Sequence, residues 1–295
     1  MRRHALKRAC ILTLGCKVNW YESQQIVRQY ADQGYEIHQR FIPNADVYIV
    51  NTCMVTAHAE KKSRNTVTRC RGGLGGERPV IVCGCCSPDR TLNKLDCHAV
   101  QSRKRAFIKV QDGCNNFCSY CIIPYLRGRS TSRPIVDVIA EVHAGNKPVV
   151  ITGIDLSSYG LDIGTDLMTL CIEVDKCGVP FELSSIEVGI VTDAFLLALR
   201  ACKNFVQKFH LPLQSGSDTV LKSMNRKYKS ADYLRAVELI RQYFPNAVLS
   251  TDVIVGFVGE TPADLAQTYA VIDAVKFAKV HTFPYSDRHL DRFRK

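Results

Sequence analysis

Three cysteines in the middle of the chain have the spacing of an iron–sulfur site. Residues 113–122 read GCNNFCSYCI and place Cys114, Cys118 and Cys121 in a C-x3-C-x2-C run. An ordinary [4Fe–4S] cluster takes four thiolates, so three of them leave one iron open. An open iron can bind the amino and carboxylate groups of S-adenosylmethionine (SAM), which an electron from the cluster cleaves to methionine and a 5′-deoxyadenosyl radical. Tyr120, directly before the third cysteine, is an aromatic side chain that can flank the adenine.

Zinc is the alternative ligand of these cysteines. Cysteine-rich spacings also bind zinc, usually as paired C-x2-C hairpins with a fourth ligand. No second C-x2-C pair follows Cys121. The spacing therefore favours the open-iron cluster over a zinc site.

Three further cysteines each follow an apolar segment in the first hundred residues: Cys16 after TLG, Cys53 after VNT and Cys85 after CG. If these segments are strands of one sheet, the three thiols can converge at its edge and hold a second three-thiolate cluster. Spacing alone leaves a second interpretation open, because free cysteine is also a common small hydrophobic residue of protein cores. Cys83 and Cys86 flank Cys85, and strand alternation puts Cys83 and Cys85 on one face, so the third ligand stays open.

The elements that position these cysteines form an α/β pattern in two parts. Strands at 9–14, 45–53 and 80–86, with helices at 21–30 and 57–71, predict a small N-terminal α/β domain over residues 8–100. Six further strands separated by helix-length intervals predict a partial (β/α)6 barrel over residues 103–295; they span 106–110, 148–152, 181–186, 208–213, 248–257 and 278–285. Active groups gather at the C-terminal ends of barrel strands, and the C-x3-C-x2-C run begins just after the first of them.

Composition narrows the class of protein. The formal net charge of +11 favours a polyanionic partner such as nucleic acid, although an unspecialised basic surface is also compatible with it. Fourteen cysteines without a secretory signal indicate metal or redox chemistry rather than a disulfide framework. No stretch reaches the length of a membrane span. We therefore expect a cytoplasmic protein with no membrane partner.

Five sequence blocks resemble the methylthiotransferase family of radical SAM enzymes, and they occur in the family's order along nearly the whole chain. The blocks are TLGCKVNWYES (13–23), VNTCMVTAHAEKKSR (50–64), KVQDGCNNFCSYCIIPYLRGRSTSRP (109–134), HLPLQSGSDTVLKSMNRKY (210–228) and STDVIVGFVGET (250–261).

The resemblance implies two [4Fe–4S] clusters with SAM as a further cofactor. Cys114, Cys118 and Cys121 would hold the SAM cluster, and Cys16, Cys53 and Cys85 an auxiliary cluster that carries the sulfur to be donated. One SAM would methylate that sulfur, and a second would supply the radical that activates C2 of an adenine. No general acid/base pair is needed for such chemistry, and no hydrolytic triad is recognisable in the sequence.

The motifs LGCKVN, NTC-x-VT and QDGCNNFCSYCIIP look like the branch that acts on N6-threonylcarbamoyladenosine next to the anticodon of tRNA, at position 37. Two alternatives stay open: the branch that acts on isopentenyladenosine, and a catalytically impaired iron–sulfur protein derived from the family. The implied partners are tRNA and an electron donor such as flavodoxin or ferredoxin.

Other residues are candidates for binding the cofactor or RNA. Four polar side chains at predicted strand ends could hydrogen-bond SAM, or could equally cap a loop: Ser185, Glu187, Gln214 and Ser215. Three glycines at strand ends could let the backbone approach SAM, or could simply form turns: Gly153, Gly256 and Gly259. Basic side chains near the motifs are candidate phosphate contacts: Arg127, Arg129, Arg133, Arg226 and Lys227.

The chain also departs from the family pattern. The interval from Cys85 to Cys114 is shorter than is usual, and the familiar GFPGE reads GFVGE, with Val258 in place of proline. Family members continue past FPYS into a small RNA-binding β-barrel called TRAM, whereas this sequence ends at FPYSDRHLDRFRK. We therefore expect the TRAM domain to be missing and the binding of RNA to be weakened.

Overall fold

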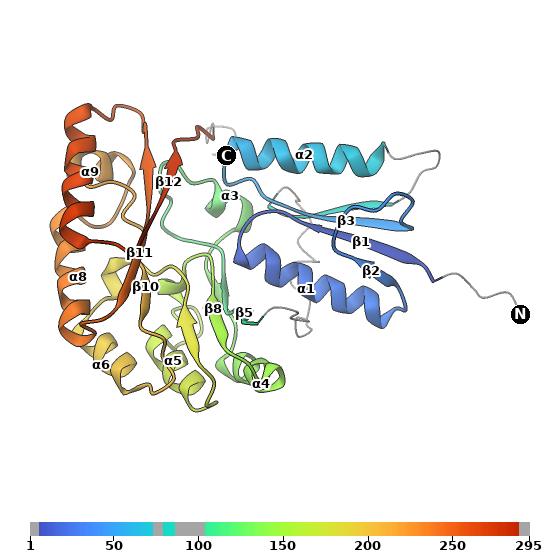
Figure 1. The fold of residues 1–295 in the computed structure, drawn as a ribbon, viewed down its shortest axis with the longest axis horizontal. Coiled ribbons are helices and arrows are strands. Elements are labelled where there is room, and N and C mark those ends of the chain that lie inside the picture. Colours follow the sequence, from blue (N-terminus) through green and yellow to red (C-terminus); the bar gives the residue numbers. More distant parts are fainter. Residues whose placement is uncertain (1–5, 73–78, 86–103, 289–295) are drawn as a thin grey trace, which may run out of the picture. The chain divides into compact units, whose positions relative to one another are not determined.

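The computed structural model describes residues 6–72, 79–85 and 104–288 (Figure 1). The chain divides into two compact units, Met1–Arg103 and Lys104–Lys295, each of which has its own sheet and core. Most of the interval between Cys85 and Cys114 lies outside the described residues. No helix within the described ranges is both long and apolar enough to cross a membrane.

The first unit is a four-stranded parallel sheet between two helices (Figure 1). Its sheet has the order β2-β1-β3-β4. The elements are β1 (Arg8–Thr13), α1 (Lys17–Asp32), β2 (Glu36–His38), β3 (Val47–Thr52), α2 (Ala57–Arg71) and β4 (Val80–Gly84).

Both faces of this sheet are covered, which explains the nearly continuous apolar runs of its strands. Ile11 packs with Ile26 of α1 on one face, whereas Tyr48 packs with Cys70 of α2 on the other. The predicted strands 9–14, 45–53 and 80–86 are confirmed as β1, β3 and β4. The short edge strand β2 was missed, and the helix predicted at 21–30 in fact begins at Lys17.

The second unit contains six parallel strands in chain order, arranged as an open barrel. One sheet has the order β5-β8-β9 and the next β10-β11-β12; single bridges, Phe181 with Phe205 and Ser185 with His210, join β9 to β10. The strands are β5 (Ala106–Lys109), β8 (Val149–Thr152), β9 (Phe181–Leu183), β10 (Lys208–His210), β11 (Val248–Val255) and β12 (Lys279–Pro284). All six predicted strands, and with them the α/β fold class, are confirmed.

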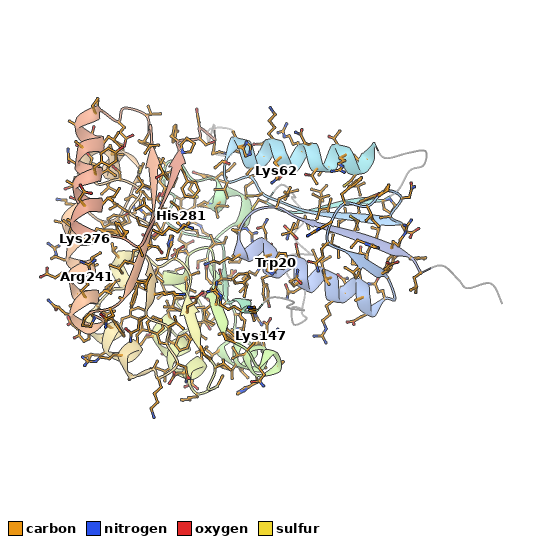
Figure 2. All side chains as sticks on the ribbon, in the orientation of Figure 1. Trp20, Lys62, Lys147, Arg241, Lys276 and His281 are labelled. Carbon is orange, nitrogen blue, oxygen red and sulfur yellow. The ribbon has the colours of Figure 1, made fainter. Side chains whose placement is uncertain are left out.

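Helices cover the outside of this barrel (Figure 1). They are α4 (Ile135–Gly145), α5 (Leu167–Asp175), α6 (Asp193–Ala201), α8 (Ser230–Tyr243) and α9 (Pro262–Val275), with the shorter α3 (Ile123–Arg127), α7 (Asp218–Ser223), η2 (Leu156–Ser158) and η3 (Val188–Ile190); β6 (Gln111–Asp112) and β7 (Thr131–Ser132) form a small antiparallel pair. Neighbouring helices are tied together: Arg241 of α8 donates to the backbone carbonyl of Val275 at the end of α9. Figure 2 shows Arg241 and Lys276 on this outer layer and His281 on β12.

Candidate functional site

The C-x3-C-x2-C run forms a loop between β6 and α3, close after the first barrel strand. The backbone N–H of Asn116 points at the Cys114 Sγ, at 3.4 Å, and Phe117 reverses the chain with a φ of 49°. The N–H of Cys121 then donates to the carbonyl of Cys118, at 2.9 Å. The loop therefore has a defined backbone path that keeps the three thiols within one short segment.

Hydrogen bonds join this loop to the segment at the end of α7. The Ser119 N–H donates to the Met224 carbonyl (3.0 Å), and its hydroxyl donates to the Ser223 carbonyl (2.8 Å). The Asn225 side-chain amide donates to the carbonyl of Phe117 (3.0 Å). The loop that carries the three thiols is thus held by contacts from a part of the chain more than a hundred residues away.

Arg226 lies beneath the middle cysteine. Its Nη1 is 3.4 Å from the Cys118 Sγ, its Nη2 pairs with Glu187, and its Nε donates to the Tyr228 hydroxyl at 3.2 Å. The side chain is only 5% exposed. Its predicted role as a phosphate contact is therefore wrong, because the guanidinium is buried and already held by protein groups.

The first cysteine of the loop has a carboxylate neighbour. Asp155 Oδ2 is 3.8 Å from the Cys114 Sγ and accepts from the Asn116 side chain at 3.0 Å. Burial raises the pKa of Cys114 to about 12, to which the Asp155 charge contributes. Burial and the Glu187 carboxylate also raise the pKa of Asp155. The Cys114 thiol is therefore protonated at neutral pH without iron, and iron binding must displace that proton.

A cluster of charges lies at the base of the loop. Asp112 accepts from Lys109 (3.0 Å) and, through both carboxylate oxygens, from Arg127 (3.0 Å each). Burial raises the pKa of Asp112, but Lys109 and Arg127 outweigh it and bring the pKa down to about 2. The Arg127 side chain is 2% exposed, so its predicted contact with RNA phosphate is also wrong. Arg133 donates to Glu141 (2.9 Å), which likewise gives it a partner within the protein.

A cavity of about 330 Å³ opens beside this loop. It is lined by Asn116, Cys118, Glu187, Val188, Gly189, Asn225, Arg226, Lys227, Tyr228 and Asp232. Of the predicted cofactor-binding residues, the structure places Glu187 in this wall. Exposed Lys227 lies at the same cavity and bonds to the Asn225 side chain (2.9 Å).

The other predicted cofactor residues are placed as follows. Tyr120 is half-buried and packs against an apolar cluster that includes Met224 and Phe257. Ser185 is exposed at the end of β9. A Cβ on Gly153 would lie 2.8 Å from the Gln111 side-chain oxygen, so close packing against Gln111 accounts for this glycine. A contact between any of these and SAM stays a prediction.

The predicted cofactor residues in the PLQSGS segment and after β11 differ in their surroundings. Gln214 has a φ of 63° and bridges to Val253 of β11. Ser215 is fully buried, where its hydroxyl is 3.3 Å from that of Thr268 on α9, an environment that favours a structural role. Gly256 has a φ of 74° and open space beside it. The open space leaves room for a ligand to approach the backbone there.

The donor set fits a multi-iron cluster better than a single ion. Within the described ranges, no three His, Cys, Asp or Glu side chains converge as ligands of one metal ion would. A [4Fe–4S] cluster makes a different demand, because each thiolate binds a different iron. Three thiols on one loop, with a cavity beside Cys118 for a further ligand, meet that demand.

The cysteines of the first unit follow three neighbouring strands. Cys53 and Cys85 come one residue after β3 and β4, and Cys16 comes just before α1. β3 lies between β1 and β4 in the sheet, and all three run parallel. A Cβ on Gly15 would lie only 2.9 Å from the Cys53 Cβ, which shows how closely the Cys16 turn approaches Cys53.

Hydrogen bonds fix the edge at which these cysteines lie. Asn19 donates to the carbonyls of Leu14 (2.8 Å) and Thr52 (2.7 Å), and so joins the turn after β1 to the end of β3. The Ser63 hydroxyl of α2 accepts from the Cys53 N–H (3.0 Å) and donates to the Cys53 carbonyl (2.9 Å). The polar side chain of Asn19 also explains why apolar periodicity missed the first turn of α1.

The structure separates Cys85 from its neighbour Cys83. Cys83 belongs to the apolar cluster that includes Ile11, Ile26 and Ile49. Gly84 has a φ of 77°, which ends the strand and breaks its alternation, and the Cys85 N–H donates to the Thr52 carbonyl (3.0 Å). Cys83 therefore serves as a core residue, and Cys85 is the better candidate ligand. Cys86 lies outside the described residues.

Sequence reasoning missed Asp155 and Asn116, which lie near the thiols, and it gave Arg226 the role of a phosphate contact. Asp155 follows the strand at 148–152, so the rule that active groups follow barrel strands could have found it. The structure also brings together Ser250, His210 and Asp252: the two His210 nitrogens lie 2.9 Å from Ser250 Oγ and 3.2 Å from Asp252 Oδ2. None of these three lines the cavity beside Cys118.

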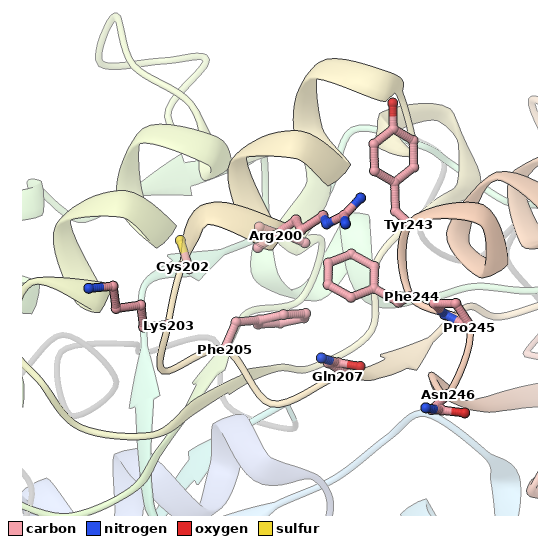
Figure 3. Close-up of a pocket in the computed structure, with 10 residues that line it drawn as sticks. Arg200, Cys202, Lys203, Phe205, Gln207, Tyr243, Phe244, Pro245 and Asn246 are labelled. Carbon is pink, nitrogen blue, oxygen red and sulfur yellow. The ribbon is translucent and has the colours of Figure 1, made fainter.

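A second cavity, of about 390 Å³, lies at the opposite, N-terminal ends of β10 and β11. Figure 3 shows Phe205 and Phe244 within it, with Arg200 and Lys203 nearby. These two rings pack with Phe209 in the barrel core, with ring centroids 5.5 to 5.9 Å apart. In barrels of this type the N-terminal end mainly serves stability, which separates this cavity from the cysteine loop.

Comparisons with known proteins agree with this arrangement. The Radical SAM superfamily matches residues 108–272, and the Uncharacterized protein family UPF0004 matches residues 8–102. The radical SAM methyltransferase TsrM from Kitasatospora setae has a similar fold, with a TM-score of 0.65, 14% identity and coverage of 95% of this chain and 75% of that one. The barrel and its cysteine loop therefore define a radical SAM enzyme.

Sequence relatives show to which family of radical SAM enzymes the chain belongs. The threonylcarbamoyladenosine tRNA methylthiotransferase MtaB of Chlamydia pneumoniae is 40% identical, covering 94% of this chain and 74% of the relative; the protein of the same name in Bacillus subtilis is 36% identical, with 94% and 73%. A tRNA-2-methylthio-N(6)-dimethylallyladenosine synthase of Acetivibrio thermocellus is 31% identical, with 95% and 70%. The chain belongs to the methylthiotransferase family of radical SAM enzymes. This family implies a [4Fe–4S] cluster and SAM as cofactors.

Proposed function

We propose that the protein places a methylthio group on C2 of N6-threonylcarbamoyladenosine at position 37 of tRNA, using two [4Fe–4S] clusters and SAM. The observation that carries this proposal is the presence of two separate sets of three cysteines. One set follows three parallel strands of the first unit, and the other lies on a single loop after the first barrel strand. Relatives that are 40% and 36% identical are named for this modification, which supports the choice of substrate.

Each unit has a distinct part in this proposal. Residues 8–100 would carry the auxiliary cluster on Cys16, Cys53 and Cys85, and residues 103–295 the SAM cluster on Cys114, Cys118 and Cys121. When bound, the clusters and SAM supply the donated sulfur, the methyl group and the radical that activates the base. Arg226 and Asn116 would donate to the thiolate sulfurs of Cys118 and Cys114. Glu187 would hold the Arg226 guanidinium in place.

The cavity beside the cysteine loop is the proposed entrance for SAM. Its wall holds both Glu187 and Cys118, so a ligand there can contact the loop and a carboxylate at once. Tyr120, Gly153, Ser185, Gln214, Ser215 and Gly256 remain further candidates for cofactor contact. A tRNA substrate and an electron donor such as flavodoxin or ferredoxin would place this enzyme in the cytoplasm.

Mass spectrometry of tRNA nucleosides tests the function. A strain that lacks the gene should lose 2-methylthio-N6-threonylcarbamoyladenosine and regain it when the gene is restored, but not when Cys118→Ala is restored. Loss of the methylthio isopentenyl nucleoside instead would transfer the assignment to the second branch, which the relative from Acetivibrio thermocellus represents. Unchanged nucleosides would refute the enzymatic proposal.

Iron analysis tests the cofactors separately. After anaerobic reconstitution, the chain should hold about eight irons, because two four-iron clusters are proposed. Cys53→Ala should reduce this to about four while leaving the SAM cleavage of the other cluster in place. About four irons in the unmodified chain would contradict the auxiliary cluster.

A further inference from the structure

Helix α2 differs in charge from every other α-helix in the described part of the chain. It carries five basic residues, Lys61, Lys62, Arg64, Arg69 and Arg71, against one acidic residue, Glu60, for a net charge of +4. Each of the other described α-helices has a net charge between −2 and +1 when its Lys, Arg, Asp and Glu are counted. Among the described residues of the first unit, the excess of positive charge is therefore concentrated on one element.

These charges face solvent. All five basic side chains are exposed, whereas Ser63 and Cys70 form the buried side of the helix against the sheet. Figure 2 labels Lys62 on α2. The helix is about 22 Å long at 1.5 Å per residue, so its charges form an extended stripe rather than a point.

Some of these charges already have partners within the unit. Arg64 pairs with Glu60, and the Arg69 guanidinium lies over the Phe41 ring, 3.8 Å from its centroid. Lys61 and Lys62 differ, since neither makes an ion pair among the described residues. Two adjacent ammonium groups are thus available to an external anion without breaking an internal contact.

Helix α2 lies close to Cys53, one of the proposed ligands of the auxiliary cluster. The helix begins four residues after Cys53, and its Ser63 bonds to both backbone polar groups of Cys53. A ligand on the exposed face of α2 would therefore lie on the same element that fixes one of the proposed auxiliary thiolates. Lysine contacts to phosphate position a nucleic acid without reading its sequence. Such contacts suit a helix that would hold the RNA backbone near the sheet edge where the proposed auxiliary cysteines lie.

We infer that the exposed face of α2, centred on Lys61 and Lys62, binds the sugar–phosphate backbone of the substrate RNA. This inference rests on the proposed function, since it takes tRNA as the polyanion. Neutralising phosphates releases counterions, so these contacts contribute mainly to the salt dependence of binding. They also steer the RNA toward the first unit before any base is recognised.

The test is the salt dependence of binding to an unmodified tRNA transcript, measured by fluorescence anisotropy with the reconstituted protein. Lys61→Gln/Lys62→Gln should bind more weakly at low salt. Each lost phosphate contact removes about 0.7 to 0.9 from the slope of log affinity against log salt. Between about 50 and 200 mM salt, the double variant should therefore lose roughly tenfold less affinity than the unmodified chain.

A matched control removes two positive charges elsewhere. Lys203→Gln/Lys279→Gln changes two exposed barrel side chains that, like Lys61 and Lys62, make no ion pair among the described residues. Its slope should equal that of the unmodified chain. An added charge, Asn65→Lys on the exposed side of α2, should make the slope steeper. Iron content and thermal unfolding establish that each variant is folded.

The possible outcomes separate the inference from the function on which it rests. Tight, salt-dependent binding by the unmodified chain with an unchanged slope in Lys61→Gln/Lys62→Gln would overturn the role of α2 and leave the tRNA substrate standing. An equal loss of slope in the barrel control would show diffuse attraction rather than a site on α2. No binding of tRNA by the unmodified chain would overturn both proposals.

Discussion

Arg226 is a positively charged side chain that the structure brings against a proposed cluster ligand. Its buried guanidinium donates toward Cys118 while Glu187 and Tyr228 hold its other nitrogens. Hydrogen bonds to the sulfurs are among the factors that set the reduction potential of an iron–sulfur cluster. A fixed positive charge there also favours the reduced cluster, which carries one more negative charge.

Removing this charge should therefore make the cluster harder to reduce. We expect Arg226→Gln to lower the midpoint potential of the SAM cluster, measured by a redox titration followed by electron paramagnetic resonance. The variant should also lose stability, by about 3 kcal/mol, because it leaves the Glu187 carboxylate without its buried partner.

Arg226→Lys is the informative control for this prediction. Lysine keeps the charge but has a single ammonium in place of the planar fork that bonds to three groups at once. Its midpoint potential should lie between those of the unmodified chain and Arg226→Gln. Identical potentials in all three proteins would contradict a hydrogen bond from Arg226 to a cluster ligand.

Asp112 makes the stability of the barrel unit sensitive to acid. Its pKa is lowered from 3.8 to about 2 in the folded chain by Lys109 and Arg127. The carboxylate therefore stabilises the fold above about pH 4, and this contribution is lost as the pH falls through about 2. Asp112→Asn should unfold about 3 kcal/mol more easily at pH 7, because two buried cations would face a neutral amide.

The measurement is urea unfolding of the two proteins between pH 7 and pH 2. The difference in unfolding free energy should shrink as the pH falls from about 4 to about 2, since the carboxylate is protonated first in the unfolded chain and, near pH 2, in the folded chain as well. A difference that stays constant over this range would show that Asp112 contributes through packing and not through its charge.

At the scale of the element, the end of β4 depends on a glycine. A Cβ on Gly84 would lie 2.2 Å from the Asn51 side-chain oxygen and 2.5 Å from the Thr52 carbonyl oxygen on β3. Gly84 also has a φ of 77°, and this left-handed backbone conformation costs a residue with a Cβ about 1–2 kcal/mol. Gly84→Ala should therefore lower the unfolding free energy by about 3 kcal/mol and reduce the iron content, as Cys85 is displaced.

Gly34→Ala separates the two causes of this loss. Gly34 belongs to the same unit and has a φ of 81°, but nothing lies within 4 Å of where its Cβ would be. This variant should lose only about 1 kcal/mol from the backbone conformation and should keep its iron. If both variants lose equal stability, crowding at Gly84 is not the cause.

Apolar runs were sufficient to predict the main strands of both units. Strands that are buried on both faces or that line a barrel give long runs of Val, Ile and Leu, which the sequence displays directly. β2 has only three residues and no such run. The first turn of α1 was missed because Asn19 is buried through hydrogen bonds, which leave no apolar periodicity.

The candidate site was predictable only in part. Cys114, Cys118 and Cys121 are close in sequence, so their spacing alone indicated a shared loop. Arg226 lies more than a hundred residues from the thiol that it contacts, and it resembled a surface phosphate contact. Contacts of this kind depend on the packing of distant segments, which no local pattern records.

At the scale of the whole molecule, the two units have separate hydrophobic cores. Ile49 is fully buried in the core of the first unit, and Ile151 is almost fully buried in that of the barrel. Ile49→Ala should destabilise the first unit by about 2–5 kcal/mol. We expect the iron content of the reconstituted protein to fall toward about four, while SAM cleavage persists.

The reciprocal variant checks this independence. Ile151→Ala should weaken the barrel and SAM cleavage but preserve the cluster of the first unit, detected by its own paramagnetic signal. If either substitution abolishes both clusters, the two units must unfold together, and the separate cores do not give separate stability.

The order of strands in the first unit has a consequence for the tolerance of this protein to sequence change. Backbone hydrogen bonds hold neighbouring strands about 4.8 Å apart whatever side chains they carry. The sheet thus fixes the spacing of the turns that follow β1, β3 and β4. Core residues here can be exchanged over evolutionary time without altering the intervals between these turns, whereas an inserted strand or a slipped register would change them at once.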